Sequence, residues 1–178
     1  MTGTYATELR TTFKRLMDDA KLGTHQRDFL ELRWLDQVIW MEAKASKAQR
    51  FYYGLRLITI VGAVIVPALV ALNSLDGWAG HAGQIGSWFV SLVVAVSAAV
   101  EGFFQFGQRW RNYRSTAERL KTEGWLYLEL AGPYAADGGS HNDEYGIFVR
   151  RVEELIQKNV DAYITEVTTE KQRSGGAT

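Results

Sequence analysis

Leu57 to Leu75 reads LITIVGAVIVPALVALNSL, a run without a charged side chain that lies between Arg56 and Asp76. An α-helix rises about 1.5 Å per residue, so a helix over this run is roughly 28 Å long, close to the hydrocarbon thickness of a bilayer. A helix of a soluble bundle normally carries a charged stripe on its solvent side. The run therefore predicts a membrane-spanning helix over about 55–75.

A second apolar run, Ile85 to Val100, reads IGSWFVSLVVAVSAAV. Extended through residues 101–106 it reaches about 22 residues, enough to cross a bilayer with some tilt. We therefore expect a second span over about 85–107 and a transmembrane hairpin over 55–108. The alternative is a pair of buried helices in a soluble bundle, and the lack of a charged stripe counts against it.

The composition of the chain excludes several functions. Its formal net charge is zero, so nothing indicates affinity for nucleic acid. It has no cysteine, which excludes disulfides and thiol chemistry. Its histidines, His25, His81 and His141, lie in separate segments without metal-ligand spacing, and neither a phosphate-binding glycine loop nor a nucleophile–base arrangement is present. We expect no enzymatic activity, no metal and no cofactor.

Basic residues predict the orientation of the hairpin. Lysines and arginines precede the first span and follow the second, whereas the connection from Asn73 to Gly86 has none. By the positive-inside rule, both termini lie in the cytoplasm and the connection lies outside. Trp78 and Trp88 fit the outer interface. The aromatic residues expected at the inner interface are Phe51, Tyr52, Tyr53, Phe103, Phe104, Phe106 and Trp110.

The segments outside the hairpin have a helical period. Residues 1–23 form a weakly amphipathic segment, and the apolar spacing in 24–54 predicts a helix that continues into the first span. Residues 109–172 are expected to form a cytoplasmic helical hairpin, and 173–178 a disordered tail.

The fold class expected is an all-α membrane protein, with two transmembrane helices in a hairpin and long cytoplasmic helical extensions. Because a single hairpin covers little of its apolar surface, we expect several copies to assemble as a homo-oligomeric helical bundle.

Small and polar residues form a stripe on the second span, which includes one carboxylate. Their spacing of three and four places them within one arc of a helix. Three interpretations remain open: packing between helices, the lining of a water-filled path, or an interfacial ion pair of Glu101 with Arg109 or Arg56. As a path, a ring of Glu101 side chains favours cations, and Val94 is a candidate apolar gate. The candidate pore-lining residues are Ser87, Ser91, Val94, Ala98, Glu101, Gln105 and Gln108.

Two sequence blocks resemble a known family. They are WRNYRSTAERLKTEGWLYLELAGPY, from Trp110 to Tyr134, and WLDQVIWMEAKASKAQRFYYGLRL, from Trp34 to Leu57. The chain resembles the SLATT-type two-helix membrane proteins and a closely allied bacterial two-span family of unknown function, over about Arg33 to Val167. The matching positions are Trp110, Tyr113, Arg114, Glu118, Leu120, Lys121 and Glu123.

The resemblance implies a multi-pass protein of the bacterial inner membrane with cytoplasmic helices. SLATT relatives are proposed to be pore-forming effectors switched by nucleotide-sensing partners, so it also implies an unidentified cytoplasmic regulator. Read from spacing alone, Arg114 with Glu118 and Arg119 with Glu123 form pairs four residues apart on one helix. These charges predict a cytoplasmic neck held by packing and ion pairs, with a ligand or partner site and direct gating as alternatives. The residues assigned to this neck are Trp110, Tyr113, Arg114, Glu118, Lys121 and Glu123.

The function expected from the sequence is a homo-oligomeric ion channel or pore whose second span lines a path for cations. The expected partners are the lipid bilayer, further copies of the chain and the permeant cations. The alternative is a non-conducting membrane scaffold or a partner-recruiting effector subunit, in which the stripe serves packing alone.

Overall fold

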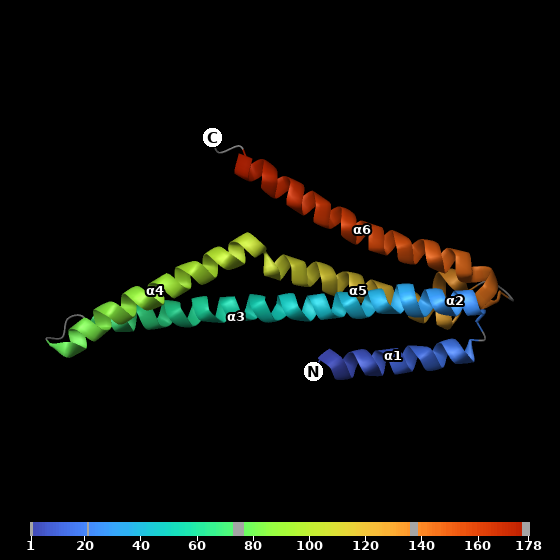
Figure 1. Ribbon diagram of the computed structural model, residues 1–178, viewed down its shortest axis with the longest axis horizontal. Helices are drawn as coiled ribbons and strands as arrows, with labels where there is room; N and C mark the ends of the chain where they lie inside the picture. The colour runs from blue at the N-terminus through green and yellow to red at the C-terminus, as the bar shows by residue number, and fades with distance from the viewer. Residues whose placement is uncertain (1, 21, 73–76, 136–138, 176–178) are drawn as a thin grey trace. The chain divides into compact units, whose positions relative to one another are not determined.

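The computed structural model describes residues 2–20, 22–72, 77–135 and 139–175, with side chains described between 5 and 161 in these ranges. All regular secondary structure in these residues is helical, without a strand, which confirms the all-α class (Figure 1). The chain divides into two compact units. The terminal unit comprises Met1–Ala45 and Arg111–Thr178, and the hairpin unit comprises Ser46–Trp110.

The helices follow one another with short connections. A helical stretch begins at Thr24, where the apolar period predicts it, and runs without interruption into the first apolar run. It consists of α2, the π-helical segment η1 and α3, and α3 continues through Pro67. The elements are α1 (Thr2–Asp19), α2 (Thr24–Asp28), η1 (Phe29–Leu35), α3 (Asp36–Leu72), α4 (Trp78–Phe104), α5 (Phe106–Leu128), the 3-10 turn η2 (Gly132–Tyr134) and α6 (His141–Gly175).

The core of the terminal unit surrounds Trp34. Its indole is fully buried and donates a hydrogen bond of 2.9 Å from Nε1 to the carbonyl oxygen of Leu120 on α5. Phe13 of α1 meets this ring edge to face at 4.8 Å between centroids, and Phe148 of α6 approaches it at 6.1 Å. Residues from α1, η1, α5 and α6 therefore meet at one side chain.

Gly124 makes the close approach of Trp34 to α5 possible. A Cβ atom at this position would lie 1.9 Å from Cζ2 of the indole, far inside van der Waals contact. No larger residue fits unless the indole moves, and the indole is held by its hydrogen bond to Leu120. The glycine is thus required by packing, although it lies in the interior of a helix, where glycine is otherwise unfavourable.

The hairpin unit consists of the later part of α3, α4 alongside it, and the first residues of α5 up to Trp110 (Figure 1). Gly62 of α3 lies against Val94, because a Cβ atom at Gly62 would be 2.1 Å from a methyl group of that valine. Gly86 of α4 faces Leu69 of α3 less tightly, since a Cβ atom there would lie 3.5 Å from a leucine methyl group, an ordinary van der Waals distance. Small residues on each helix therefore receive large ones from the other, as expected for closely packed membrane helices.

Two helical stretches are long and apolar enough to cross a membrane, Thr24–Leu72 and Trp78–Phe104. Only 6% and 11% of their most apolar windows are buried within the chain. The core helix of a soluble protein would be mostly buried, so this exposure favours candidate membrane spans. The side chains of Val64, Phe89 and Leu92 illustrate it, with 72%, 67% and 62% of their surface exposed.

The second helix differs from the expected span at both ends. It begins at Trp78 rather than near Ile85, and residues 73–76 of the expected connection lie outside the described residues. Gly83, which belongs to the connection expected from the sequence, is buried on the helix. At the other end α4 stops at Phe104, so the expectation of a continuous helix through residues 105–108 is wrong.

The C-terminal helix extends further than expected. Helix α6 runs to Gly175, so residues 173–175 of the expected tail are helical. The rest of that tail, 176–178, lies outside the described residues. The start of α6 is stabilised by Asp143, whose carboxylate accepts hydrogen bonds from the backbone and hydroxyl of Ser140.

Replacement of Gly124 tests the role of Trp34 in the fold. We expect Gly124→Ala to lower the free energy of unfolding by about 1–3 kcal/mol, because the new methyl group overlaps a fixed indole. The control is Gly146→Ala in α6, where a Cβ atom meets nothing within 4 Å. That exchange should stabilise the helix by about 0.5–1 kcal/mol. Thermal unfolding of the full chain in detergent, followed by circular dichroism, measures both, and equal stability of the two variants would contradict the assignment.

Candidate functional site

The polar stripe of α4 is divided between two environments in the hairpin unit. Ser87 is buried, and Val94 is half-buried against Gly62. Ser91 and Ala98, by contrast, are exposed. The stripe is therefore partly an internal packing face of the hairpin, and only its outer edge faces away from α3.

Glu101 lies in the last turn of α4 and is half-buried. Among the described residues its carboxylate takes part in no ion pair, so neither Arg109 nor Arg56 neutralises it within one chain. Arg56 instead donates a hydrogen bond of 2.7 Å to the hydroxyl of Tyr52. The interfacial ion pair considered from the sequence is thus not formed.

The chain bends at Gln105, which adopts a left-handed conformation with φ 48° and ψ 43°. Its backbone N–H donates to the carbonyl oxygen of Glu101 at 2.9 Å and caps α4. Helix α5 begins at the next residue, so Gln108 belongs to a different helix from Glu101. The two glutamines therefore do not extend the face of α4 as the continuous-helix spacing predicted.

Aromatic rings surround this bend. Phe106 stacks on Phe51 at 5.2 Å and on Phe104 at 5.3 Å between centroids. Trp110 contacts Tyr52 at 6.2 Å and Tyr53 at 5.7 Å, both on α3. The aromatic residues expected at the inner interface thus include several that contact one another at one end of the hairpin unit.

Two neck residues of α5, Arg114 and Lys121, contact Glu42 of α3 in the terminal unit. The Glu42 carboxylate is 8% exposed and accepts hydrogen bonds from Arg114 at 2.7 Å and Lys121 at 2.8 Å. Glu118 pairs with the same two cations, at 2.8 Å and 2.9 Å, so the predicted Arg114–Glu118 pair is confirmed. Burial would lower the pKa of Lys121, but its hydrogen bonds to Glu42, Glu118 and Tyr5 outweigh burial and raise it. Each of the carboxylates Glu42 and Glu118 thus pairs with both Arg114 and Lys121.

Glu123 forms a second group with residues beyond α5. Arg151 of α6 donates two hydrogen bonds to its carboxylate, at 2.7 Å and 2.8 Å, and the hydroxyl of Tyr134 donates a third at 2.7 Å. The predicted pair of Glu123 with Arg119 is therefore wrong. The bond from Arg151 lowers the pKa of Glu123 below its ordinary value, and the bond from Tyr134 adds to this against the opposing effect of burial.

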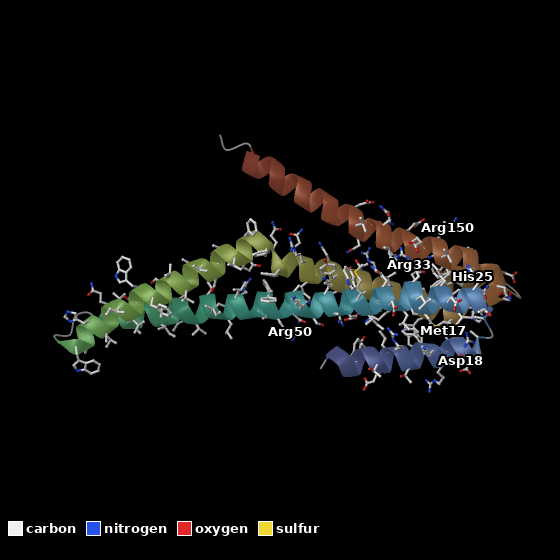
Figure 2. The ribbon with its side chains drawn as sticks, viewed as in Figure 1. Met17, Asp18, His25, Arg33, Arg50 and Arg150 are labelled. Carbon is white, nitrogen blue, oxygen red and sulfur yellow. The ribbon has the colours of Figure 1, made fainter. Side chains whose placement is uncertain are left out.

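The other neck residues have aromatic contacts. Tyr113 meets Trp40 edge to face at 5.8 Å, and Trp110 belongs to the hairpin unit. In the terminal unit, Arg33 of η1, labelled in Figure 2, pairs with Glu153 of α6 at 2.8 Å. Each of these contacts joins segments that are far apart in the sequence. These contacts fit a structural role for the neck residues.

Sequence reasoning missed Glu42, Tyr134 and Arg151 as partners of the neck. Glu42 had a detectable signal, because it adjoins Met41 on the buried side of α3, where a charge requires partners. Its partners could not be named, since Arg114 and Lys121 lie more than 70 residues further along the chain.

One family model matches this chain, under the description Protein of unknown function (DUF4231), over residues 36–141. The match covers more than half of the 178 residues and includes α4, α5 and the apolar part of α3. No curated protein matches the chain. No solved structure matches it either.

Glu123→Gln tests the charged group that joins α5 to α6. Since the folded pKa of Glu123 is lowered, its carboxylate adds stability above the ordinary pKa of about 4.3, and this is lost as the pH falls through the folded value. We expect the variant to lose about 1–3 kcal/mol at neutral pH, with less further loss on acidification than in the wild type. Glu154→Gln, at an exposed site on α6, is the control.

Thermal unfolding of both variants over a range of pH measures these effects. A Glu123→Gln protein with the stability and acid sensitivity of the control would contradict the assigned role.

Proposed function

This chain belongs to the family described as Protein of unknown function (DUF4231), and from its residues we propose that it forms a homo-oligomeric, cation-favouring ion channel in a membrane. Its two apolar stretches cross the bilayer as a hairpin, and the basic ends of that hairpin lie in the cytoplasm. The resemblance to SLATT-type proteins adds the bacterial inner membrane as the location and a cytoplasmic regulator as the trigger.

The observation that carries the proposal is the position of Glu101. A carboxylate in the last turn of an otherwise apolar helix is costly in a membrane unless it faces water or a cation. In one chain no cation neutralises it among the described residues. Assembly of several copies brings their Glu101 side chains together around an aqueous path, where a ring of negative charge attracts cations.

The division of the stripe refines which residues line the path. Ser91 and Ala98 are exposed on the outer edge of α4, so they are available to water in an oligomer. Ser87 and Val94 contribute to packing inside the hairpin and hold α4 against α3. We place Ser91, Ala98 and Glu101 along the path and the other two behind it.

The terminal unit supplies assembly and regulation in this proposal. Its helices are joined by the charged groups at Glu42 and Glu123. A partner that binds this unit acts on α3 and α5, since both helices contribute to both units.

A non-conducting scaffold is the second candidate. It is favoured by the burial of Ser87 and Ser97, because small buried residues on a membrane helix are typical of helix packing. In a scaffold, the exposed edge of α4 contacts other helices and leaves no path for water.

Current across a planar bilayer in a KCl gradient distinguishes the two. We expect discrete currents with a cation-selective reversal potential that moves toward zero in Glu101→Gln, while the oligomer stays intact. Glu154→Gln makes the same chemical change in the terminal unit and should leave the reversal potential unchanged.

An assembled Glu101→Gln oligomer with wild-type selectivity would contradict the position of Glu101 in the path. Silence of the assembled wild type, together with loss of assembly in Glu101→Gln, would favour the scaffold.

A further inference from the structure

The two units differ in how their charges are neutralised. All ion pairs among the described residues lie in the terminal unit. The described part of the hairpin unit has the cations Lys47, Arg50, Arg56 and Arg109, against Glu101 as its one carboxylate. These four residues are called the basic end below.

The basic end lies at one end of the hairpin unit. Lys47, Arg50 and Arg56 are on α3 within two turns of Tyr52, and Figure 2 shows Arg50 on this helix. Arg109 on α5 neighbours Trp110, whose ring contacts that of Tyr52. The aromatic contacts therefore bring the two basic segments to the same place.

Arg109 of the basic end has a side-chain donor without a hydrogen-bond acceptor among the described residues. Its Nε atom is buried, and no hydrogen-bond acceptor in the described residues reaches it. Buried polar groups are almost always hydrogen-bonded, so an Nε without a partner among the described residues is unusual. A guanidinium group matches the oxygen atoms of a phosphate particularly well.

Arg56 lies beside an apolar surface. It donates to the hydroxyl of Tyr52 at 2.7 Å, which fixes the position of its guanidinium group. The next residues, Leu57 and Ile58, are 60% and 43% exposed. A ligand that fits this surface therefore combines a negative headgroup with an apolar chain.

We propose that the basic end binds the headgroup of an anionic phospholipid, with its acyl chain along the exposed side chains that follow Arg56. The lipid phosphate pairs with the guanidinium groups of Arg109 and Arg56, and Lys47 and Arg50 add positive charge further along α3. Tyr52, Tyr53 and Trp110 lie at the level of the headgroups. The inference rests on the proposed membrane placement of the hairpin unit and adds a partner that stabilises one end of it.

The test uses the full-length protein in detergent, with phosphatidylglycerol and phosphatidylcholine as probes and native mass spectrometry to count bound lipids. We expect the wild type to bind phosphatidylglycerol in preference to phosphatidylcholine. Arg109→Gln and Arg56→Gln should each weaken phosphatidylglycerol binding roughly fivefold. Arg109→Lys keeps the charge without Nε and should fall between the wild type and Arg109→Gln.

Arg150→Gln is the matched control, since it removes one charge from an exposed site on α6 (Figure 2). Equal affinity of the wild type for the two lipids, or an equal effect of Arg150→Gln, would overturn the proposal. Displacement of the lipid by inorganic phosphate would show a site for free anions and would overturn it as well.

Membrane placement is tested separately, by resistance of the wild type in phosphatidylcholine vesicles to alkaline carbonate extraction. A protein that is extracted contradicts the proposed membrane function and the lipid site together. A protein that stays inserted but shows no preference for phosphatidylglycerol contradicts the lipid site alone.

Discussion

The contact of Trp34 with α5 is the constraint on which the terminal unit depends. The indole fills the space that a side chain at Gly124 would occupy and donates its N–H to the carbonyl oxygen of Leu120. Phe13 and Phe148 then pack around the same ring. One fully buried side chain therefore joins four helical segments of the terminal unit around a common core.

The hairpin unit, in contrast, buries little of its apolar surface within the chain. Its small residues allow α3 and α4 to pack closely, as at Gly62, but its large apolar residues remain exposed. Exposed apolar surface of this extent requires lipid or further helices. The terminal unit thus has a buried core, whereas the hairpin unit leaves large apolar side chains exposed, and the proposed channel starts from this contrast.

Much of the fold could be predicted from local patterns. The uncharged run from Leu57 to Leu75 and the helical period after Thr24 depend on neighbouring residues alone. They were therefore enough to predict the helical class and the long helical stretch that begins at Thr24. The pair of Arg114 and Glu118 was found for the same reason, since four residues on a helix bring two side chains together.

The errors arose where distant residues or backbone conformation decided the outcome. Glu123 pairs with Arg151 rather than Arg119, and the sequence gives no sign that α6 returns to this point. The bend at Gln105 occurs at a residue that is neither glycine nor proline, so no breaker marked it.

The candidate site was predicted only in part. The period of three and four residues correctly groups Ser87, Ser91, Val94 and Ala98 on one side of α4, but it cannot tell which edge of that side α3 covers. That distinction depends on the contact of Gly62 with Val94, which joins two separate helices.

The measurement that tests the central claim most directly is the water accessibility of α4 in the assembled protein. The chain has no cysteine, so single substitutions give unambiguous labelling sites. Ser91→Cys and Ala98→Cys lie on the edge assigned to the path, and Val96→Cys lies on the opposite, exposed side of the helix.

The oligomer in lipid vesicles is treated with a membrane-impermeant thiol reagent. The account predicts that Ser91→Cys and Ala98→Cys are labelled while Val96→Cys is protected by lipid. Protection of all three positions in an intact oligomer would contradict a water-filled path along α4.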